Sequence, residues 1–280
     1  MKFWRQDRTI SGDRRLYLYH FADAENHSRQ RMFTRAVASA WKERAEAIEE
    51  WFAPVTQAMQ QGLVGKGGLL LDIGCGAGSM PVGSEWTRIG VDVSAEVLTP
   101  RFPAIVAGCN PLPLRSGVFD AAISRFAVIF ASDVTEAIKE TRRVLVPGGT
   151  FVFSAWRSEE LNASFDVPGR ILGEQLGIRP ISRSDPSAFR LADVDETARL
   201  LSGAGFDPQS AMDVELPYLA RMDADSAFQH LMTFAGGIRT MFDRVALFDR
   251  ERVKERIVKA LDESDRTGYA TVWIAKAIEP

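Results

Sequence analysis

Short apolar runs recur through the middle of the chain without the alternation of a half-exposed strand. The first, Leu69–Ile73, follows a cluster of glycines. A continuous run of this length is typical of a strand buried on both faces of a parallel sheet. Similar runs predict further strands at Arg88–Val93, Ala104–Val106, Phe119–Ser124 and Thr150–Ser154. Helical periodicity over Asp133–Leu145 separates two of them, and alternating strands and helices predict a parallel, doubly wound sheet.

The two flanks have a different pattern. Residues 1–27 are polar and irregular. Residues 28–62 carry apolar side chains at spacings near three and four, which predicts a helix in which Pro54 marks a break or the start of a second helical piece. Beyond Trp156 the chain is mixed and polar before regular patterns return. These patterns predict a helix near Val194–Ser202, strands at Ser210–Leu216 and Thr271–Lys276, and helices across residues 222–263.

The composition is that of a globular chain. Of the 280 residues, 46% are hydrophobic and 25% are charged, which excludes a disordered class. A formal net charge of −3, with acids and bases interleaved, favours small-molecule partners over nucleic acid. Two cysteines make no disulfide framework, and no apolar run reaches the length of a membrane span. We therefore expect no membrane partner, a cytoplasmic location, and a monomer or homodimer.

The strongest local signal is a glycine-rich turn directly after the first predicted strand. It reads Asp72-Ile73-Gly74-Cys75-Gly76-Ala77-Gly78. Glycines permit positive φ and close approach of a ligand to the backbone, and open α/β sheets bind ligands at the carboxyl ends of their strands. The dinucleotide fingerprint needs a third glycine at position 79, which is serine here. The spacing therefore favours a cofactor without a pyrophosphate.

A second signal closes the next predicted strand. Asp92 lies 20 residues after Asp72, close to the spacing expected of an acid that accepts hydrogen bonds from ribose hydroxyls. A glycine-rich turn alone is often only a tight connection. The turn and the acid together indicate a nucleoside-binding site.

These residues resemble the class I S-adenosylmethionine-dependent methyltransferases, and most closely their type 11 small-molecule group. The resemblance covers about a third of the chain, from Leu69 to Trp156. It is carried by the segments Leu71–Gly78, Gly90–Ser94, Leu112–Leu114, Gly117–Asp120, Ser124–Phe126 and Glu140–Gly149.

The resemblance implies a fold and an organisation. The fold is a Rossmann-like, doubly wound, mostly parallel seven-stranded sheet with a helical cap. Residues 1–64 would form an N-terminal helical lid and residues 65–156 the cofactor-binding core. Residues 157–280 would supply the cap and the C-terminal strands that complete the sheet.

The resemblance also implies roles for individual residues. Gly74, Gly76 and Gly78 would lie under the methionine and ribose of S-adenosylmethionine, with Cys75 inside the turn. Asp72 would orient the turn and the cofactor's amino group. Asp92 would hold the ribose hydroxyls, with Val93 beside the adenine. The segment Ser124, Arg125 and Phe126 would line the methyl-transfer centre.

The sequence departs from the family pattern near the adenine. Aligning Leu112 and Pro113 places Gly108 where many members carry an aspartate that contacts the adenine amino group. Cys109 and Asn110 follow, so backbone groups or Asn110 would read the adenine instead. The spans 79–89 and 95–105 are short and contain prolines, so we expect shortened or irregular helices there.

Methyl transfer needs position and a dry site more than a catalytic triad. Three histidines make a metal site improbable, and we expect no metal. His20 and His230 are candidate bases for a hydroxyl acceptor, against the simpler interpretation that each is packed or solvated. Arg125 would pair with an acidic acceptor, against an ordinary salt bridge. Phe126, Phe130 and Trp156 would form an apolar wall, although packing in the core is the simpler role of Phe130.

Three functions stay open at this point. The first is methyl transfer to an oxygen, nitrogen or carbon of a small molecule, by in-line displacement. The second is a methyltransferase-like protein that binds the cofactor without transferring its methyl group. The third, disfavoured by Ser79, is an NAD-dependent oxidoreductase.

Overall fold

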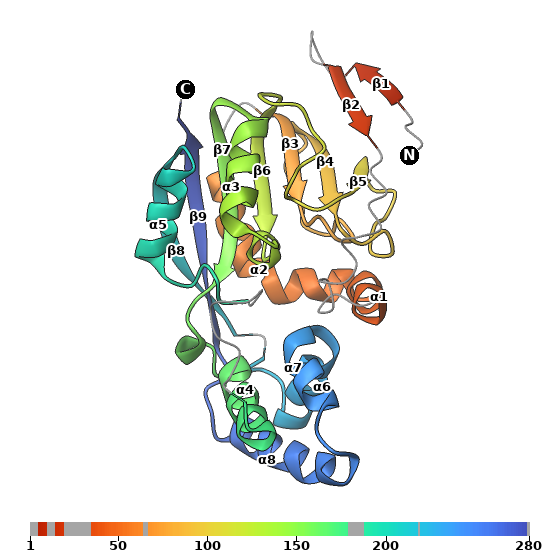
Figure 1. Cartoon of the computed structure of the whole chain (residues 1–280), viewed down its shortest axis with the longest axis vertical. Helices are drawn as coiled ribbons and strands as arrows, with labels where there is room; N and C mark the ends of the chain where they lie inside the picture. Colours follow the sequence, from red (N-terminus) through yellow and green to blue (C-terminus); the bar gives the residue numbers. More distant parts are fainter. Residues whose placement is uncertain are drawn as a thin grey trace.

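A seven-stranded sheet forms the centre of the computed structural model (Figure 1). The structure describes residues 5–9, 15–19, 35–63, 67–178, 188–217 and 219–278. The strands of the sheet are β3 (Gly68–Ile73), β4 (Trp86–Asp92), β5 (Ala104–Val106), β6 (Phe119–Arg125), β7 (Leu145–Trp156), β8 (Phe206–Leu216) and β9 (Gly268–Ala277). Every strand predicted from an apolar run is present, within a few residues at each end.

The order of the strands is β5-β4-β3-β6-β7-β9-β8. Strands β3 to β7 are parallel, and β9 is antiparallel to both of its neighbours. The predicted mostly parallel, Rossmann-like sheet is therefore confirmed. The chain adds β4 and β5 on one side of β3 and then returns to add β6 on the other side. Open α/β sheets bind ligands in the crevice that such a reversal creates, which here would lie at the carboxyl ends of β3 and β6.

Helices cover both faces of the sheet (Figure 1). In the view of the figure, α2 (Ala45–Gly62) lies behind the sheet and α3 (Val134–Val144) lies in front, while α5 (Val194–Gly203) lies beside β8 and β9. Helix α3 begins where the side chain of Asp133 accepts a hydrogen bond from the Glu136 amide at 3.0 Å. Its apolar face packs into the core, which fixes the helix against the sheet.

The expected break at Pro54 is wrong. Helix α1 (Arg35–Glu43) ends before Arg44, and Pro54 lies inside α2. A proline in a helix interior removes one backbone hydrogen bond. Helix α2 persists because its apolar side chains on both sides of the proline, including Phe52 and Val55, are buried against the core.

The two connections at one edge of the sheet are less regular than the shortened or irregular helices predicted for them. Within residues 74–85, which connect β3 to β4, and 93–103, which connect β4 to β5, no helix forms. The glycine-rich turn and Asp92 therefore lie at an edge that is covered by loops rather than by helices.

Four further helices gather below the sheet in the view of Figure 1. They are α4 (Ala163–Leu176), α6 (Ala224–Phe234), α7 (Gly236–Asp243) and α8 (Arg250–Asp262). The sequence pattern missed α4, whose apolar positions are interrupted by polar residues and by Pro168. It also missed the two-stranded sheet of β1 (Arg5–Thr9) and β2 (Arg15–Tyr19) in the segment interpreted as irregular. No helix among the described ranges is long and apolar enough to cross a membrane.

Candidate functional site

The glycine-rich turn leaves β3 at the crevice. Gly74, Gly76 and Gly78 all have positive φ, at 72°, 53° and 70°. The amide of Gly74 donates to the carbonyl of Val91 at 2.7 Å, which ties the turn to β4. A Cβ at Gly74 would overlap the side chain of Ala127, and a Cβ at Gly78 would lie 2.5 Å from the Phe102 ring. These two glycines are therefore required by packing as well as by backbone conformation.

Gly76 differs from the other two glycines of the turn. A Cβ built there would meet nothing closer than the side chain of Val97, at 4.0 Å. Protein packing therefore leaves open space above Gly76, while φ keeps the position suited to glycine. That open space beside exposed backbone is what a nucleoside cofactor needs for close approach.

Asp92 ends β4 beside this space and is only 8% exposed. Its two carboxylate oxygens accept hydrogen bonds from the amides of Gly76 and Ser94, each at 2.9 Å. Burial raises the pKa of the carboxyl, while these amide hydrogen bonds act to lower it. Each oxygen keeps a second lone pair for an incoming donor, so the carboxylate fits the two hydroxyls of a ribose.

The side chain of Asp72 is directed to Arg88. One carboxylate oxygen accepts from Nε of Arg88 at 2.9 Å and also from Nη2. Both residues are buried. Arg88 belongs to no motif in the sequence, although an arginine in the apolar run Arg88–Val93 is a detectable signal.

The two thiols near the site are not poised for reaction. Burial, reinforced by the carboxylates of Asp72 and Asp92, raises the pKa of the Cys75 thiol far above its usual range. Burial raises the pKa of Cys109 to about 11. Both side chains are therefore neutral thiols at physiological pH.

The expected adenine side of the site is open around Gly108. A Cβ at this position would meet only the amide of Asn110, at 4.0 Å, and its φ is not positive. Cys109 and Asn110 are half-buried, and Val93 is 40% exposed at the end of β4. An exposed valine next to Asp92 suits contact with a flat aromatic base.

The end of β6 forms the other wall of the crevice. The hydroxyl of Ser124 is fully buried, donates to the carbonyl of Ile73 at 3.1 Å and accepts from the amide of Val128 at 3.0 Å. It joins the ends of β3 and β6 instead of facing the crevice. Phe126 has a φ of 53°, and its amide donates to the hydroxyl of Ser154 at 3.1 Å. A positive φ at a residue with a side chain is strained, so the surrounding structure must hold Phe126 in this conformation.

Arg125 reaches away from the sheet to helix α2. Its guanidinium donates to Glu49 at 2.6 Å and to the hydroxyl of Thr56 at 2.7 Å. Thr56 in turn donates to the same carboxylate at 2.6 Å. The arginine and glutamate side chains are 13% and 20% exposed. The pair therefore links α2 to the edge of the expected methyl-transfer centre.

His230 lies in an aromatic group between α2 and α6. Its ring centroid is 4.5 Å from that of Trp51 and 4.7 Å from that of Phe234. Burial, together with the positive charge of Arg44, lowers the pKa of His230 to about 4. The imidazole is neutral at pH 7 and a weak base. The other candidate base, His20, lies outside the described residues.

Aromatic rings pack together at the ends of β6 and β7. Phe126 stacks on Trp156 with centroids 4.4 Å apart, and Phe52 of α2 lies 5.1 Å from Phe126. All three are buried. Phe130, expected to pack in the core, is instead 46% exposed. Of the three residues predicted to form an apolar wall, Phe126 and Trp156 lie in contact, and Phe52 of α2 joins them in place of Phe130.

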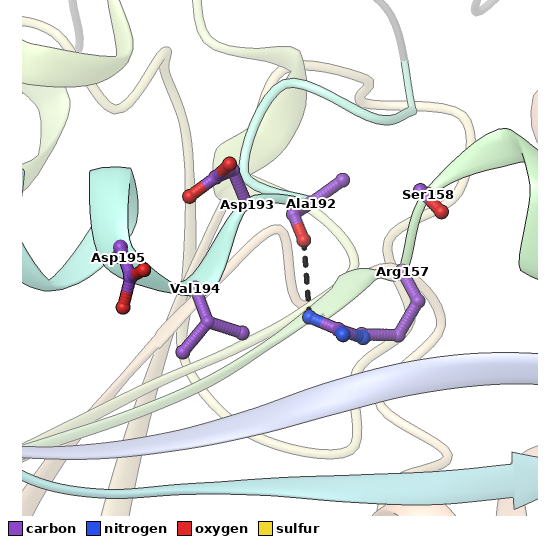
Figure 2. A pocket seen from close by; sticks show the side chains of 6 residues that line it. All are labelled: Arg157, Ser158, Ala192, Asp193, Val194 and Asp195. Carbon is purple, nitrogen blue, oxygen red and sulfur yellow. Dashed lines mark hydrogen bonds between the residues drawn. The ribbon is translucent and has the colours of Figure 1, made fainter.

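A separate cavity of about 290 Å³ lies at the start of α5 (Figure 2). It is lined by Arg157, Ser158, Ala192, Asp193, Val194 and Asp195. Arg157 crosses it to donate to the carbonyl of Ala192 at 3.3 Å, as the dashed line in Figure 2 shows. None of the residues expected to bind the cofactor lines this cavity.

Comparison with known proteins identifies the region that contains the site. Residues 71–153 match the model of a family described as a methyltransferase domain. This part of the chain is therefore similar to methyltransferase domains. The match covers the glycine-rich turn, Asp92, Gly108 and the segment from Ser124 to Phe126.

Curated relatives of the methyltransferase domain act on different acceptors. A probable tRNA methyltransferase 9B of Bos taurus is 37% identical over 108 residues, 36% of this chain and 24% of that protein. A malonyl-[acyl-carrier protein] O-methyltransferase of Pseudescherichia vulneris is 31% identical over 143 residues, 45% of this chain and 56% of that protein. The chain thus spans between a quarter and about half of the length of these relatives.

The solved structures agree in fold. An N-methyltransferase of Haemonchus contortus, in complex with phosphomonomethylethanolamine and S-adenosylhomocysteine, is 14% identical with a TM-score of 0.51. The similarity covers 90% of this chain and 60% of that chain. At this identity the similarity establishes the shared fold alone.

Proposed function

We propose that the crevice binds S-adenosylmethionine and that the chain transfers its methyl group to an acceptor. The observation that carries the proposal is the pairing of Gly76 with Asp92. Open space lies above the glycine, and a buried carboxylate with spare acceptor capacity lies beside it. The membership of residues 71–153 in a methyltransferase domain family supports the same cofactor.

Each wall of the crevice has a task in this proposal. Asp92 accepts the ribose hydroxyls, Val93 packs against the adenine, and the half-buried Cys109 and Asn110 flank the base. The cofactor supplies a methyl group already activated on a sulfonium, which a nucleophile displaces in line. The strained backbone of Phe126, held by Ser154, then fixes the wall against which the acceptor is positioned.

We propose a small, largely apolar molecule as the acceptor. The rings of Phe52, Phe126 and Trp156 give an apolar wall, and the net charge of −3 disfavours a polyanion. Arg125 would bind an acidic group of the acceptor by exchanging Glu49 for it, because a guanidinium fork pairs equally well with either carboxylate. His230 stays neutral and would accept a hydrogen bond rather than remove a proton.

The test combines binding with transfer. Calorimetric titration with S-adenosylmethionine should show one site in the wild-type chain. In Asp92→Asn, which keeps the shape but loses the charge, binding should be about tenfold weaker or worse, the size of one charge-assisted hydrogen bond. A radiolabelled-methyl assay against apolar acids, amines, phenols and tRNA then identifies the acceptor class. Tight binding with no transfer to any class would instead support a cofactor-binding scaffold.

A further inference from the structure

We propose that Arg88 is a positioning residue of the cofactor site. Its guanidinium neutralises the charge of Asp72 and fixes the conformation of the glycine-rich turn. Asp92 is then the one carboxylate at the site whose charge is not neutralised, and it faces the cofactor. The inference rests on the proposed function and extends it to a residue that lies outside the glycine-rich turn and the ribose-binding acid. It also gives Asp72 a different role, because one oxygen of its carboxylate accepts both hydrogen bonds from the arginine.

The first step is the burial of the Arg88–Asp72 pair. The two side chains are 8% and 5% exposed. Nε and Nη2 of the arginine donate to one carboxylate oxygen, and Nη1 donates to the carbonyl of Met80 at 2.7 Å. The guanidinium thus joins the end of β3 to the segment that follows the turn. A buried arginine that makes several hydrogen bonds holds its partners in one geometry.

The second step is the contact with Phe102. The guanidinium carbon lies 4.1 Å from the centre of this ring. The same ring fills the space where a Cβ at Gly78 or Gly90 would be, at 2.5 and 2.8 Å. Arg88 therefore reaches the turn by two routes, through Asp72 before it and through Phe102 packed on Gly78.

The third step is the charge balance around Cys75. The charges of Asp72 and Asp92 raise the pKa of this thiol, and the charge of Arg88 lowers it. Two carboxylates and one guanidinium leave a local charge of about −1. Among the described residues, Asp92 forms no ion pair, whereas Asp72 does. Removing the arginine alone would present two negative charges to a ligand in the crevice.

This balance predicts how the site distinguishes cofactor from product. S-adenosylmethionine carries a sulfonium and one more positive charge than S-adenosylhomocysteine. An extra carboxylate charge near the crevice would favour the sulfonium form selectively. A loss of positioning alone would weaken both ligands in the same proportion.

The experiment measures the dissociation constants of both ligands by calorimetry at pH 8. In Arg88→Met, the affinities for both ligands should fall. The ratio of the affinity for S-adenosylmethionine to that for S-adenosylhomocysteine should rise by roughly three- to tenfold, which is the effect of one screened charge at a distance on the order of 10 Å. In the double variant Asp72→Asn with Arg88→Met, the preference should return to the wild-type ratio. In Arg88→Lys, the ratio should stay near wild type while both affinities fall, because an ammonium keeps the charge but not the fork.

Arg142→Met is the matched control. This arginine also bridges backbone carbonyls, those of Gly205 and Ile278, beside β8 and β9 and away from the crevice. It should lower stability and leave both affinities unchanged. If Arg88→Met folds poorly, the double variant and Arg88→Lys supply the comparison, since neither leaves an unpaired buried charge.

The outcomes separate the two proposals. If the wild-type chain binds neither ligand, the proposed function fails. If the wild-type chain binds both and depends on Asp92, but Arg88→Met and Arg88→Lys leave both affinities and their ratio unchanged, the role of Arg88 is wrong. If the affinities for the two ligands fall by the same factor in Arg88→Met, so that their ratio is unchanged, the claim that Arg88 neutralises the charge of Asp72 at the site is wrong.

Discussion

The amide of Gly76 donates a hydrogen bond to the carboxylate of Asp92 at 2.9 Å. This contact joins the turn after β3 to the end of β4, two segments 16 residues apart in sequence. It holds the carboxylate beside the open space above the glycine. The contact also explains why the turn and the acid are informative together, since each fixes the position of the other.

Gly76→Ala should abolish cofactor binding at a small cost in stability. The added methyl enters the open space, and φ of 53° costs about 1 kcal/mol for a residue with a Cβ. Gly117→Ala is the matched control, because Gly117 has φ of 63° and nothing within 4 Å of its Cβ position. Calorimetry should show lost binding in the first variant alone, with similar shifts in melting temperature. Equal binding in both variants would contradict the placement of the cofactor.

Gly108→Asp should strengthen cofactor binding. The position has room for a side chain and no positive φ, so the substitution introduces no strain. An added carboxylate would accept a hydrogen bond from the adenine amino group, worth about 1 kcal/mol and hence about fivefold in affinity. Gly108→Ala, which lacks the acceptor, should leave affinity unchanged. The same gain in both variants, or in neither, would place the adenine elsewhere.

The stability of the chain should fall in mild acid because of His230. Its pKa is lowered in the folded state to about 4, below the unfolded value of 6.5. A depressed folded pKa contributes stability that is present above pH 6.5 and is lost as pH falls from 6.5 toward 4. The loss between pH 7 and pH 5 should be about 1–2 kcal/mol, measured by urea unfolding.

His230→Phe is the comparison for that measurement. A phenyl ring can keep the contacts with Trp51 and Phe234 but has no titrating group. The variant should lose less stability over the same pH interval. An identical pH dependence in the variant would show that other groups dominate the acid response.

The Arg125–Glu49 pair should affect acceptor binding more than cofactor binding. Glu49→Gln weakens the hold on the guanidinium and leaves Thr56 in place. If Arg125 binds an acidic acceptor, this variant should lower KM for an acidic acceptor several-fold, because less exchange is needed. Arg125→Met should raise the same KM. Neither variant should change the dissociation constant of S-adenosylmethionine by more than about twofold, the size of a remote effect.

A double-mutant cycle checks the pair itself. Combining Glu49→Gln with Arg125→Met should give a coupling energy of about 0.5–3 kcal/mol in urea unfolding. A coupling near zero would mean that the contact contributes nothing to docking α2. An acceptor KM that responds to neither substitution would remove Arg125 from the proposed acceptor site.

The sequence was sufficient for the sheet because its buried strands are continuous apolar runs. Leu69–Ile73 and Phe119–Ser124 lie in the centre of the sheet, where no alternation is needed. Helix α4 was not predicted because Pro168 and polar residues interrupt its pattern of apolar positions. Packing of its buried residues against the rest of the chain stabilises it instead. Helix α2 continues through Pro54 for the same reason, since burial of Phe52 and Val55 outweighs the local preference of proline.

The site was only partly readable from the sequence. Residue type and spacing predict Gly74, Gly76, Gly78 and Asp92 as site residues, because glycine and acid positions carry local information. The ion pairs of Asp72 with Arg88 and of Arg125 with Glu49 could not be found that way. Each joins side chains whose pairing depends on strand register or on the docking of α2. The low pKa of His230 likewise arises from burial between helices distant in sequence.

The most direct test of the central claim is a crystal structure of the chain grown with S-adenosylhomocysteine. We expect the ribose hydroxyls within hydrogen-bonding distance of Asp92 and the nucleoside over the open space at Gly76. Density for the ligand elsewhere, such as in the cavity beside Arg157, with Asp92 bound only to its two amides, would contradict it.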